Sequence, residues 1–448
     1  MANGNFKASR SRAGISRRDA LVGAAAIGAT LAAPVRVRAQ ETTLRWWSPQ
    51  SSPAQLAAYE TQIKLFESTN PGVKVVFEKT SDEGYQPQLA AAFASGEVPN
   101  VVTHLPSFAV SDYWSNGLLE AFNDVIEAVG PEKYYKGAND IYEIDKGVYA
   151  GTGIGNSAAN MMWIRRDLME KAGVDKIPET WDELRAACQK MQGGGIYGAP
   201  LPYAKNSMTT LTIIGFIHLA GGQVFSPDLD VALDSDETRN ALEFYKSMKE
   251  LCPPGATNYS WGESLTAFVS GATATGIYTG RVLINVNEQN PPIADYVTCA
   301  TYPTISKDVG PWTFNDFPSV FIPKQAGDMD MTKKFAASLY DGEGYIQQLH
   351  AAPGHVLPVL KTVAEDPRYL DNPIIKKYTA EVDLMSAAAA AGYNLGWESK
   401  AHKPNVKAGA VVGSDVLAEM VQRIVLNGED TSQVIGETSK AIEDIMKA

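Results

Sequence analysis

Apolar and polar residues alternate in a way that predicts strands and helices in turn along the chain after residue 40. Residues 43–47 form a short strand pattern that ends at the polar segment 48–53. Apolar residues then recur at three- and four-residue steps, which predicts a helix: Leu56, Tyr59, Ile63 and Phe66. Residues 73–78 and 100–103 are two further strand patterns, with a helix around 89–93 between them. Strands joined by helices pair in parallel through right-handed crossovers, so the pattern predicts an α/β sheet.

The later part of the chain is richer in helices and contains no internal repeat. Residues 161–164 read as a strand, and a helix is predicted to begin with Thr180 as N-cap and Glu183 three residues on, which is a capping box. An amphipathic helix is predicted over 234–251. Further helical patterns lie at 263–269, 330–340, 343–350, 374–390, 414–426 and 431–446.

Three glycines on alternate positions, Gly151, Gly153 and Gly155, precede Asn156 and Ser157. Their strand-like flanks favour an extended crossover. A nucleotide-binding Gly-rich loop would need glycine at position 156 and a helix that opens there, and the sequence offers neither.

Side chains at the carboxyl ends of the predicted strands are the first candidates for a ligand site. In α/β sheets of this kind ligands bind at that edge, which here comprises the loops 48–53, 81–85 and 104–108. These strand ends and loops supply Trp47, Ser48, Gln50, Asp82, Tyr85 and Ser107. Because adjacent strand residues face opposite sides, one of Trp46 and Trp47 belongs to the core. We assign Trp47 to the site, although the sequence leaves this choice open, as it leaves open a simple turn role for Asp82.

The first 39 residues carry an export-signal pattern. Residues 16–21 contain paired arginines, 21–33 form a mildly apolar run rich in Ala and Gly, and 37–39 place small residues before a cleavage site after Ala39. Paired arginines before so mild a run resemble a twin-arginine (Tat) signal, although Ala20 stands where Phe is frequent. The run is too short to span about 30 Å of hydrocarbon as an anchor. We expect export by the Tat translocase and a soluble periplasmic protein.

Composition and charge narrow the function classes. The chain is 45% apolar and 20% charged, which is typical of a globular protein. Its net charge is −12, and residues 1–39 contribute +6 (seven Arg/Lys, one Asp), so the remainder is near −18. So acidic a body argues against nucleic acid or anionic lipid as a partner. The histidines show no metal-ligand spacing, so no metal or cofactor is expected. Three cysteines allow at most one disulfide, and whether Cys252 and Cys299 pair is left open.

A series of short motifs resembles family 1 extracellular solute-binding proteins, the maltose-binding-protein-like subunits of ABC importers. The resemblance covers about residues 45–360 and thins after 370. It is carried, in order, by Asn-Pro-Gly-Val-Lys-Val at 70–75, Ala-Ser-Gly-Glu-Val-Pro-Asn-Val-Val at 94–102, the segment 162–173, Pro-Glu-Thr-Trp-Asp-Glu-Leu at 178–184, the segments 233–245 and 267–271, and Pro-Gly-His-Val-Leu-Pro at 353–358.

The resemblance implies a type II periplasmic-binding-protein fold, with two α/β lobes joined by crossover hinge strands. The N-terminal lobe would comprise 40–152 plus 316–366, and the C-terminal lobe 153–315 plus 367–448. Relatives close on their ligand by hinge motion.

The resemblance also adds residues to the predicted site. The hinge crossovers would contribute Asn156, Ser157, Asn315 and Asp316. Thr279, Gly280 and Arg281 fall where relatives carry Gly-Pro-Trp, whose Trp often stacks on sugar. A guanidinium there can hydrogen-bond hydroxyls or hold a carboxylate, which suggests a polar or acidic sugar rather than a long maltodextrin; a surface ion pair is the alternative. The roles of Trp261 and Trp397 stay undecided.

The function implied is the capture of a small carbohydrate (sugar, sugar acid or polyol) by a monomeric protein that delivers it unchanged to an ABC permease and its ATPase. The alternative is an exported carbohydrate-active enzyme. The sequence has neither GxSxG nor HExxH, but its many carboxylates leave a glycosidase pair open.

Overall fold

The computed structural model describes residues 42–448 except 51, 81–83, 136–137 and 316–317. The predicted export signal and its cleavage site lie outside these residues. Among the helices described, none combines the length and apolar character that a membrane crossing requires.

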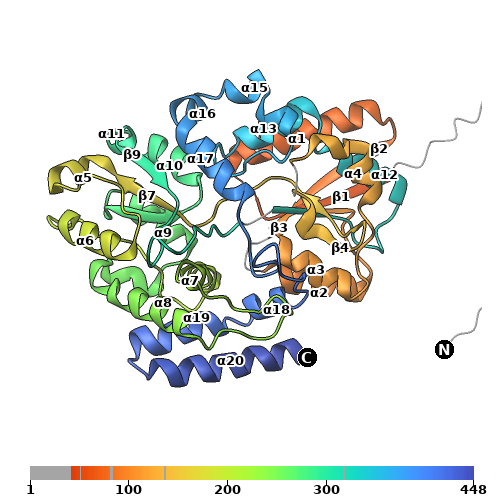
Figure 1. Ribbon diagram of the computed structural model, residues 1–448. Helices are drawn as coiled ribbons and strands as arrows, with labels where there is room; N and C mark the ends of the chain where they lie inside the picture. The colour runs from red at the N-terminus through yellow and green to blue at the C-terminus, as the bar shows by residue number, and fades with distance from the viewer. Residues whose placement is uncertain (1–41, 51, 81–83, 136–137, 316–317) are drawn as a thin grey trace, which may run out of the picture. The chain divides into compact units, whose positions relative to one another are not determined.

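One sheet has five strands and is parallel in its first half (Figure 1). β1 pairs in parallel with β2 and with β3, which confirms the arrangement predicted from the strand–helix–strand pattern. β10 returns from much later in the chain and pairs antiparallel with β3 and with β6. In sheet order the strands are β2 (Val73–Lys79), β1 (Thr42–Ser48), β3 (Val101–Pro106), β10 (Pro318–Phe321) and β6 (Thr152–Gly153).

The two adjacent tryptophans of β1 face opposite sides of this sheet. Trp46 is fully buried, and its indole lies 4.5 Å from the Tyr59 ring and donates from Nε1 to Thr103 Oγ1 at 2.9 Å. Trp47 is half-buried on the other face. Trp46 is therefore the core residue of the pair. The helices that cover the Trp46 face or flank the sheet are α1 (Pro53–Thr69), α4 (Asn123–Val129), α12 (Met329–Ser338) and α13 (Gly342–His350).

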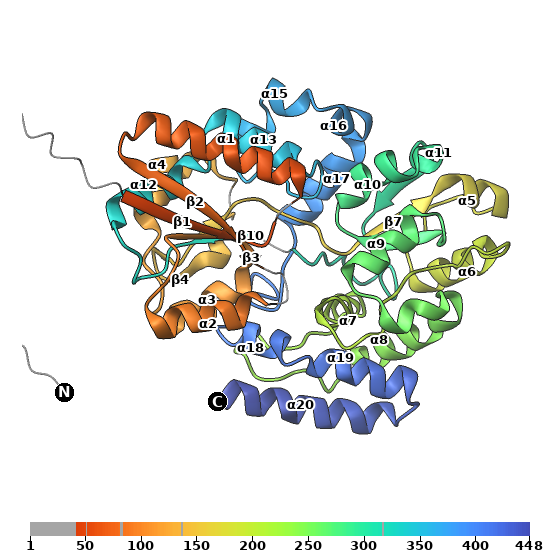
Figure 2. The ribbon, with the colours of Figure 1, turned by 180° about the vertical axis from the view of Figure 1, so that it is seen from behind.

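A second sheet has three strands in the order β8-β7-β9, and both pairings are antiparallel. The strands are β7 (Met161–Arg165), β8 (Thr275–Tyr278) and β9 (Val297–Ala300). Figure 2 shows its helices from behind: α5 (Arg166–Ala172), α6 (Trp181–Met191), α7 (Ser207–Leu219), α8 (Asp236–Ser247), α9 (Trp261–Val269) and α10 (Arg281–Gln289). α7 is buried on nearly every side, which explains its almost uniformly apolar sequence.

Chain segments cross between the two sheets and pair with one another. Residues 154–160 lead from β6 to β7, and residues 301–317 lead from β9 back to β10. Isolated bridges join Ala158 to Asn315, and Asn156 to Leu357. The edge at which β1 and β3 end is therefore also the edge at which the chain leaves for the second sheet. The predicted boundaries between two lobes remain a proposal.

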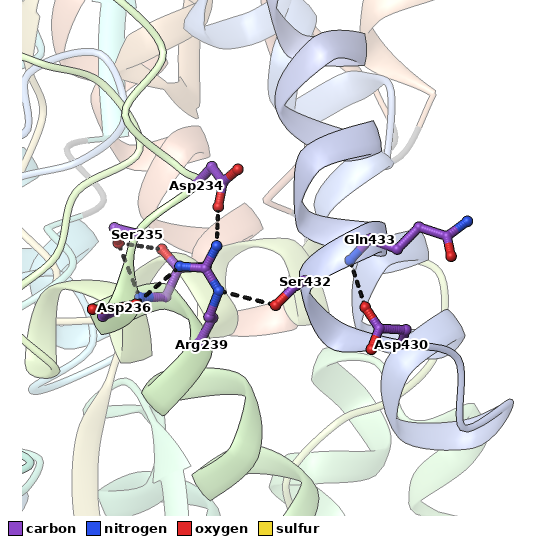
Figure 3. A network of polar contacts seen from close by, with 8 residues as sticks. Asp234, Ser235, Asp236, Arg239, Asp430, Ser432 and Gln433 are labelled. Carbon is purple, nitrogen blue, oxygen red and sulfur yellow. Dashed lines mark hydrogen bonds and ion pairs between the residues drawn. The ribbon is translucent and has the colours of Figure 1, made fainter.

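Three helices near the C-terminus pack on α3 (Ser107–Ser115), α7 and α8: α18 (Ala408–Gly413), α19 (Val416–Val421) and α20 (Thr431–Lys447). α17 (Thr379–Ala390), which precedes them, packs on β9. Figure 3 shows how polar groups join α8 to α20. The Arg239 guanidinium donates to Asp234, to Asp236 at 3.2 Å and to Ser432 at 3.1 Å, while Asp430 caps α20 by accepting from the Gln433 amide at 2.8 Å. These contacts are exposed, so they fix orientation more than they add stability.

Two local predictions are refined. Thr180 does cap α6 by accepting from the Glu183 amide at 3.4 Å, but the Glu183 carboxylate accepts from the Glu179 amide, one residue before the predicted partner. The three cysteines are buried and unpaired, which settles the question of Cys252 and Cys299 against a disulfide.

Candidate functional site

The predicted residues Ser48, Gln50 and Arg281 meet where β1 ends. Arg281, the first residue of α10, donates from Nη2 to Gln50 Oε1 at 3.1 Å, and Gln55 Nε2 donates to the same oxygen at 2.7 Å. The Ser48 hydroxyl is buried 3.3 Å from His104 Nδ1. The contact between Arg281 and Gln50 links the second sheet's helix to the first sheet's strand end. We call Ser48, Gln50, His104, Arg281 and Gln348 the Arg281 cluster.

The Arg281 cluster is electrostatically unusual because its cation is surrounded by neutral groups. Gln348 Nε2 donates to His104 Nε2 at 3.0 Å, so His104 carries its proton on Nδ1 and is neutral. Burial and the nearby Arg281 charge lower the pKa of His104 to about 3, and the same causes hold the pKa of His355 well below its usual range. Among the described residues, no carboxylate forms an ion pair with Arg281.

The backbone packs tightly around Gly280, which is one of the predicted site residues. A Cβ at Gly280 would lie 1.8 Å from the Gly354 carbonyl oxygen and 2.9 Å from Met385 Sδ. Only glycine fits so close an approach. Gly280, which stands where the family motif has Pro, therefore allows close packing here. The Arg281 cluster therefore lies beside a tightly packed junction between Gly280 and Gly354.

Ser107 and Asn315 form a second group around Asn394. Asn394 Nδ2 donates to Ser107 Oγ at 2.9 Å and to the Asn315 carbonyl at 3.2 Å. Asn315 Nδ2 in turn donates to the Ala389 carbonyl at 2.5 Å. Ser107 and Asn315 are at least 99% buried, so they hold the crossover to α3.

The segment after Asn394 reaches the second sheet's helices. The Glu398 carboxylate is buried and accepts from the backbone amides of Val224 and Phe225 at 2.8 and 2.9 Å. His218 Nε2 lies 2.8 Å from the same carboxylate, and the His218 ring stacks on Trp312 at 4.2 Å. This segment therefore contacts both α3 and the end of α7.

The remaining predicted residues lie apart. Trp47 donates from Nε1 to Glu78 at 2.6 Å and lies 5.6 Å from the Arg45 guanidinium. Tyr85 is buried at the start of α2 (Tyr85–Ser95). Asn156 and Ser157 are buried in the crossover, and their Oδ1 and Oγ atoms have no hydrogen-bond partner among the described residues. Asp82 and Asp316 lie outside the described residues.

An aromatic pocket lies where the crossovers meet the second sheet. Trp261, the first residue of α9, is half-buried, donates from Nε1 to Ser207 Oγ at 3.4 Å and packs edge-on against Tyr278 at 5.7 Å. Asn160 Oδ1 accepts from the Phe314 amide at 2.7 Å and so ties the two crossovers together. We call this the Trp261 pocket; it is lined by Ala159, Asn160, Met208, Leu211, Thr212, Trp261, Ile277 and Phe314.

The Trp261 pocket has the composition of a carbohydrate site, a flat ring face beside a few polar groups. Asn160 and Thr212 supply the polar side chains of the lining. The free volume is about 10 Å³, enough for about one water molecule, so a sugar ring requires the pocket to widen in the bound state.

Sequence reasoning missed Asn160 and Thr212 and left Trp261 undecided. The available signal was the capping box formed by Ser260 and Glu263, which places Trp261 at the first position of α9. Trp397 donates from Nε1 to the His402 carbonyl at 3.0 Å and does not line the pocket. Within the described ranges, no group of three or more His, Cys, Asp or Glu side chains could hold a metal ion.

Comparison with known proteins decides the family. The sequence profile of the bacterial extracellular solute-binding proteins matches residues 49–345, which is more than half of the chain. The chain belongs to this family. It is therefore a solute-binding protein of the kind that works with ABC transporters, and the family serves solute transport.

Several proteins match this solute-binding protein over most of their length, at low sequence identity. YcjN of Escherichia coli (strain K12), named as a candidate periplasmic-binding protein of an ABC transporter, is 25% identical over 397 residues, which are 86% of this chain and 88% of YcjN. The maltose-bound MalE3 of T. maritima superimposes with a TM-score of 0.77 at 20% identity, covering 90% of this chain and all of MalE3. A Thermotoga lettingae TMO solute-binding protein bound to α-D-tagatose gives 0.76 at 21%, with 90% and 100% coverage. These likenesses confirm the maltose-binding-protein-like fold.

Proposed function

We propose that this solute-binding protein captures a small carbohydrate (a sugar, sugar acid or polyol) between its two sheets and delivers it unchanged to an ABC permease and its ATPase. The observation that carries the proposal is the Trp261 pocket: an aromatic face that shares its walls with two crossovers, residues 154–160 and 301–317. The bound sugars of the two structural neighbours, maltose and tagatose, support the ligand class.

The pocket explains how binding and closure would be coupled. Asn160 and Phe314 belong to the crossovers, while Trp261 and Thr212 belong to helices of the second sheet. A ligand that contacts these groups and the first sheet's edge together stabilises the closed form alone, so its binding shifts the population toward closure. The permease then recognises that closed surface. We place the boundaries of the two moving lobes at 152/153, 315/316 and 366/367.

The site on the first sheet's side would come from the segment that follows β2 and the segment that precedes β10. Asp82 and Asp316 belong to these segments and stay in the proposed site as acceptors for sugar hydroxyls. Ser107 contributes indirectly: its hydroxyl accepts a hydrogen bond from Asn394 and so positions the segment that contains Asn394.

We also propose that the chain is exported by the Tat translocase, cleaved after Ala39 and active as a soluble periplasmic monomer. The acidic body and the absence of a membrane-crossing helix among the described residues support this proposal. N-terminal sequencing of the secreted protein tests the cleavage site, and replacement of Arg17 and Arg18 by Lys should abolish export.

The ligand class is tested by thermal denaturation of the purified protein with monosaccharides, disaccharides, sugar acids and polyols. A ligand that binds the native state alone at 100 times its Kd adds about 2.7 kcal/mol of stability. We expect at least one compound to raise Tm and to titrate at 1:1 without product. Turnover of the ligand, or a library without any stabilising compound, would contradict the proposal.

A further inference from the structure

β2 is the outermost strand of the five-stranded sheet. It pairs with β1 on one side, and no other strand of the described chain pairs with its second side. A strand at the edge of a sheet presents unpaired N–H and C=O groups, which are a template for pairing with another chain. The β2 sequence, Val-Lys-Val-Val-Phe-Glu-Lys, is rich in residues that favour strands, and Val76 is 38% exposed. β2 therefore has the composition and the free side that the addition of a strand requires.

Hydrogen bonds at the two ends of β2 show which of its residues face outward. The Thr42 amide donates to the Gly72 carbonyl at 2.9 Å. At the other end, the Thr80 amide donates to the Ser48 carbonyl at 3.0 Å, so the even-numbered residues face β1. Backbone groups of alternate residues point to opposite sides of a strand, and the outward groups consequently belong to the odd-numbered residues. We call this row the β2 edge: it comprises Val73, Val75, Phe77 and Lys79.

One side chain occupies the middle of the β2 edge. The half-buried Glu67, in the last turn of α1, accepts from the Val75 amide through its carboxylate at 2.8 Å. The Val73 amide donates to the Asn70 carbonyl at 3.1 Å, within the turn that joins α1 to β2. A carboxylate that holds an edge amide keeps the carbonyl of an incoming strand away from it, and its charge adds a desolvation penalty to strand addition.

The sequence of β2 is complementary to itself in one antiparallel register. Two copies related by a two-fold axis at Val76 overlap over all seven residues of the strand. Val75 of each copy then lies opposite Phe77 of the other, and both belong to the outward row that forms the hydrogen-bonded pairs of an antiparallel ladder. Val76 lies opposite its own counterpart, as a pair without hydrogen bonds in which the side chains approach closely.

The charged residues of β2 favour the same register. With the axis at Val76, Lys74 lies opposite Glu78 of the second copy, and opposite charges stabilise a cross-strand pair. Glu78 also accepts from Arg45 at 2.8 Å, so Lys74 would join an existing ion pair. An axis at Lys74 would place two lysines against each other and would shorten the overlap. The register with full overlap is therefore also the one without a like-charged pair.

We propose that the β2 edge is a latent self-association surface, that a second copy of this chain is the partner that fits it, and that Glu67 keeps it closed by holding the Val75 amide. This inference supplies a physical reason for the proposed monomer, and it is independent of the carbohydrate site.

Sedimentation velocity of Glu67→Ala over a concentration series tests the proposal. We expect this variant to form a dimer with a dissociation constant at least tenfold below that of the natural protein. Glu67→Gln, whose side-chain oxygen still accepts from an amide, should sediment as the natural protein does. Glu60→Ala is the matched control, because it removes an exposed glutamate of α1 that contacts Lys64 rather than the β2 edge, and it should leave the association state unchanged.

Disulfide trapping in the Glu67→Ala background tests the register. Glu67→Ala/Val76→Cys should crosslink two copies on mild oxidation, because the proposed pair brings the two Cα atoms to about 4.5 Å, within the disulfide range. In Glu67→Ala/Lys74→Cys the two thiols would lie about 13 Å apart along the strands and should stay unlinked. The natural cysteines are buried and do not compete.

Two results would overturn the proposal. One is a Glu67→Ala variant that sediments as the natural protein does at every concentration. The other is a dimer in which a cysteine at position 74 crosslinks as readily as one at position 76, since association would then not use the β2 edge in this register.

Discussion

The Arg281 cluster and the Trp261 pocket both lie at the crossover region, yet they satisfy their polar groups in different ways. In the Arg281 cluster, Gln50 Oε1 accepts from Arg281 and from Gln55, and His104 is fixed by Gln348. In the Trp261 pocket, the indole is half-exposed and lies beside the Asn160 and Thr212 side chains. The Arg281 cluster joins polar side chains of the two sheets to one another, whereas the Trp261 pocket places an aromatic face beside a few polar groups, which is the arrangement that a carbohydrate site needs.

The largest expected effect concerns acid stability and involves His104 of the Arg281 cluster together with the buried His355. The folded pKa of His104 is about 3, below its usual 6.5, so the unfolded chain binds the proton first. The stabilising contribution is complete above pH 6.5 and is lost as pH falls toward 3, by up to about 1.4 kcal/mol per pH unit for this one group.

Urea unfolding at pH 7, 5 and 4 measures this loss, with His104→Asn as the comparison. Asn tolerates the positive φ of 64° at this position and does not titrate. The variant should lose less stability between pH 7 and 4 than the natural protein. Identical pH slopes would show that His104 is not buried as a neutral ring.

Gly280→Ala should destabilise the junction by about 1–3 kcal/mol, because the added Cβ meets the Gly354 carbonyl oxygen. Gly262→Ala is the matched control, since a Cβ at that helical position meets nothing within 4 Å. Replacing helical glycine by alanine there should add up to about 1 kcal/mol. If both variants unfold at the same urea concentration, the tight approach of Gly280 to Gly354 is not a feature of the native fold.

Trp261→Ala should weaken binding of the identified sugar at least tenfold, which is about 1.4 kcal/mol, because the ring face on which the sugar packs is removed. Trp261→Phe should retain part of the affinity. Trp47→Ala serves as the control for loss of a half-buried tryptophan and should bind normally, since Trp47 is engaged with Glu78 and Arg45. Titration calorimetry distinguishes these cases; a larger loss in Trp47→Ala would move the site to the end of β1.

Arg281→Ala should have the smallest effect on binding. Because its guanidinium donates to Gln50 inside the packed junction, we expect a stability loss of about 0.5–1.5 kcal/mol and a change in sugar affinity below about threefold. Competition with neutral and acidic sugars checks this. A selective tenfold loss for acidic sugars would restore Arg281 to the site, as its position in the family motif suggests.

The fold could be predicted from the sequence because the periodicity of apolar residues and the order of strands, helices and motifs are enough to determine it. The strand–helix alternation up to residue 103 predicts the parallel pairing of β1 with β2 and β3, and the motif order predicts the family. The helix that begins at Thr180 was also predictable, since a capping residue acts within one turn.

The site was less predictable because its chemistry depends on contacts between distant segments. Gln50 and Ser107 stand at strand ends as expected, but Arg281 and Asn394, which lie more than 200 residues later, are hydrogen-bonded to their side chains. Trp261 lies on a helix rather than at a strand end, so the strand-end rule could not select it. No local pattern reports whether a polar group is already satisfied.

A crystal structure of the protein with the sugar that raises its Tm most is the most direct measurement. We expect one sugar ring against the Trp261 indole, with hydrogen bonds to both sheets' segments and an intact glycosidic or anomeric centre. A ligand seated away from Trp261 and touching one sheet alone, or a cleaved product in the pocket, would contradict capture between the two sheets.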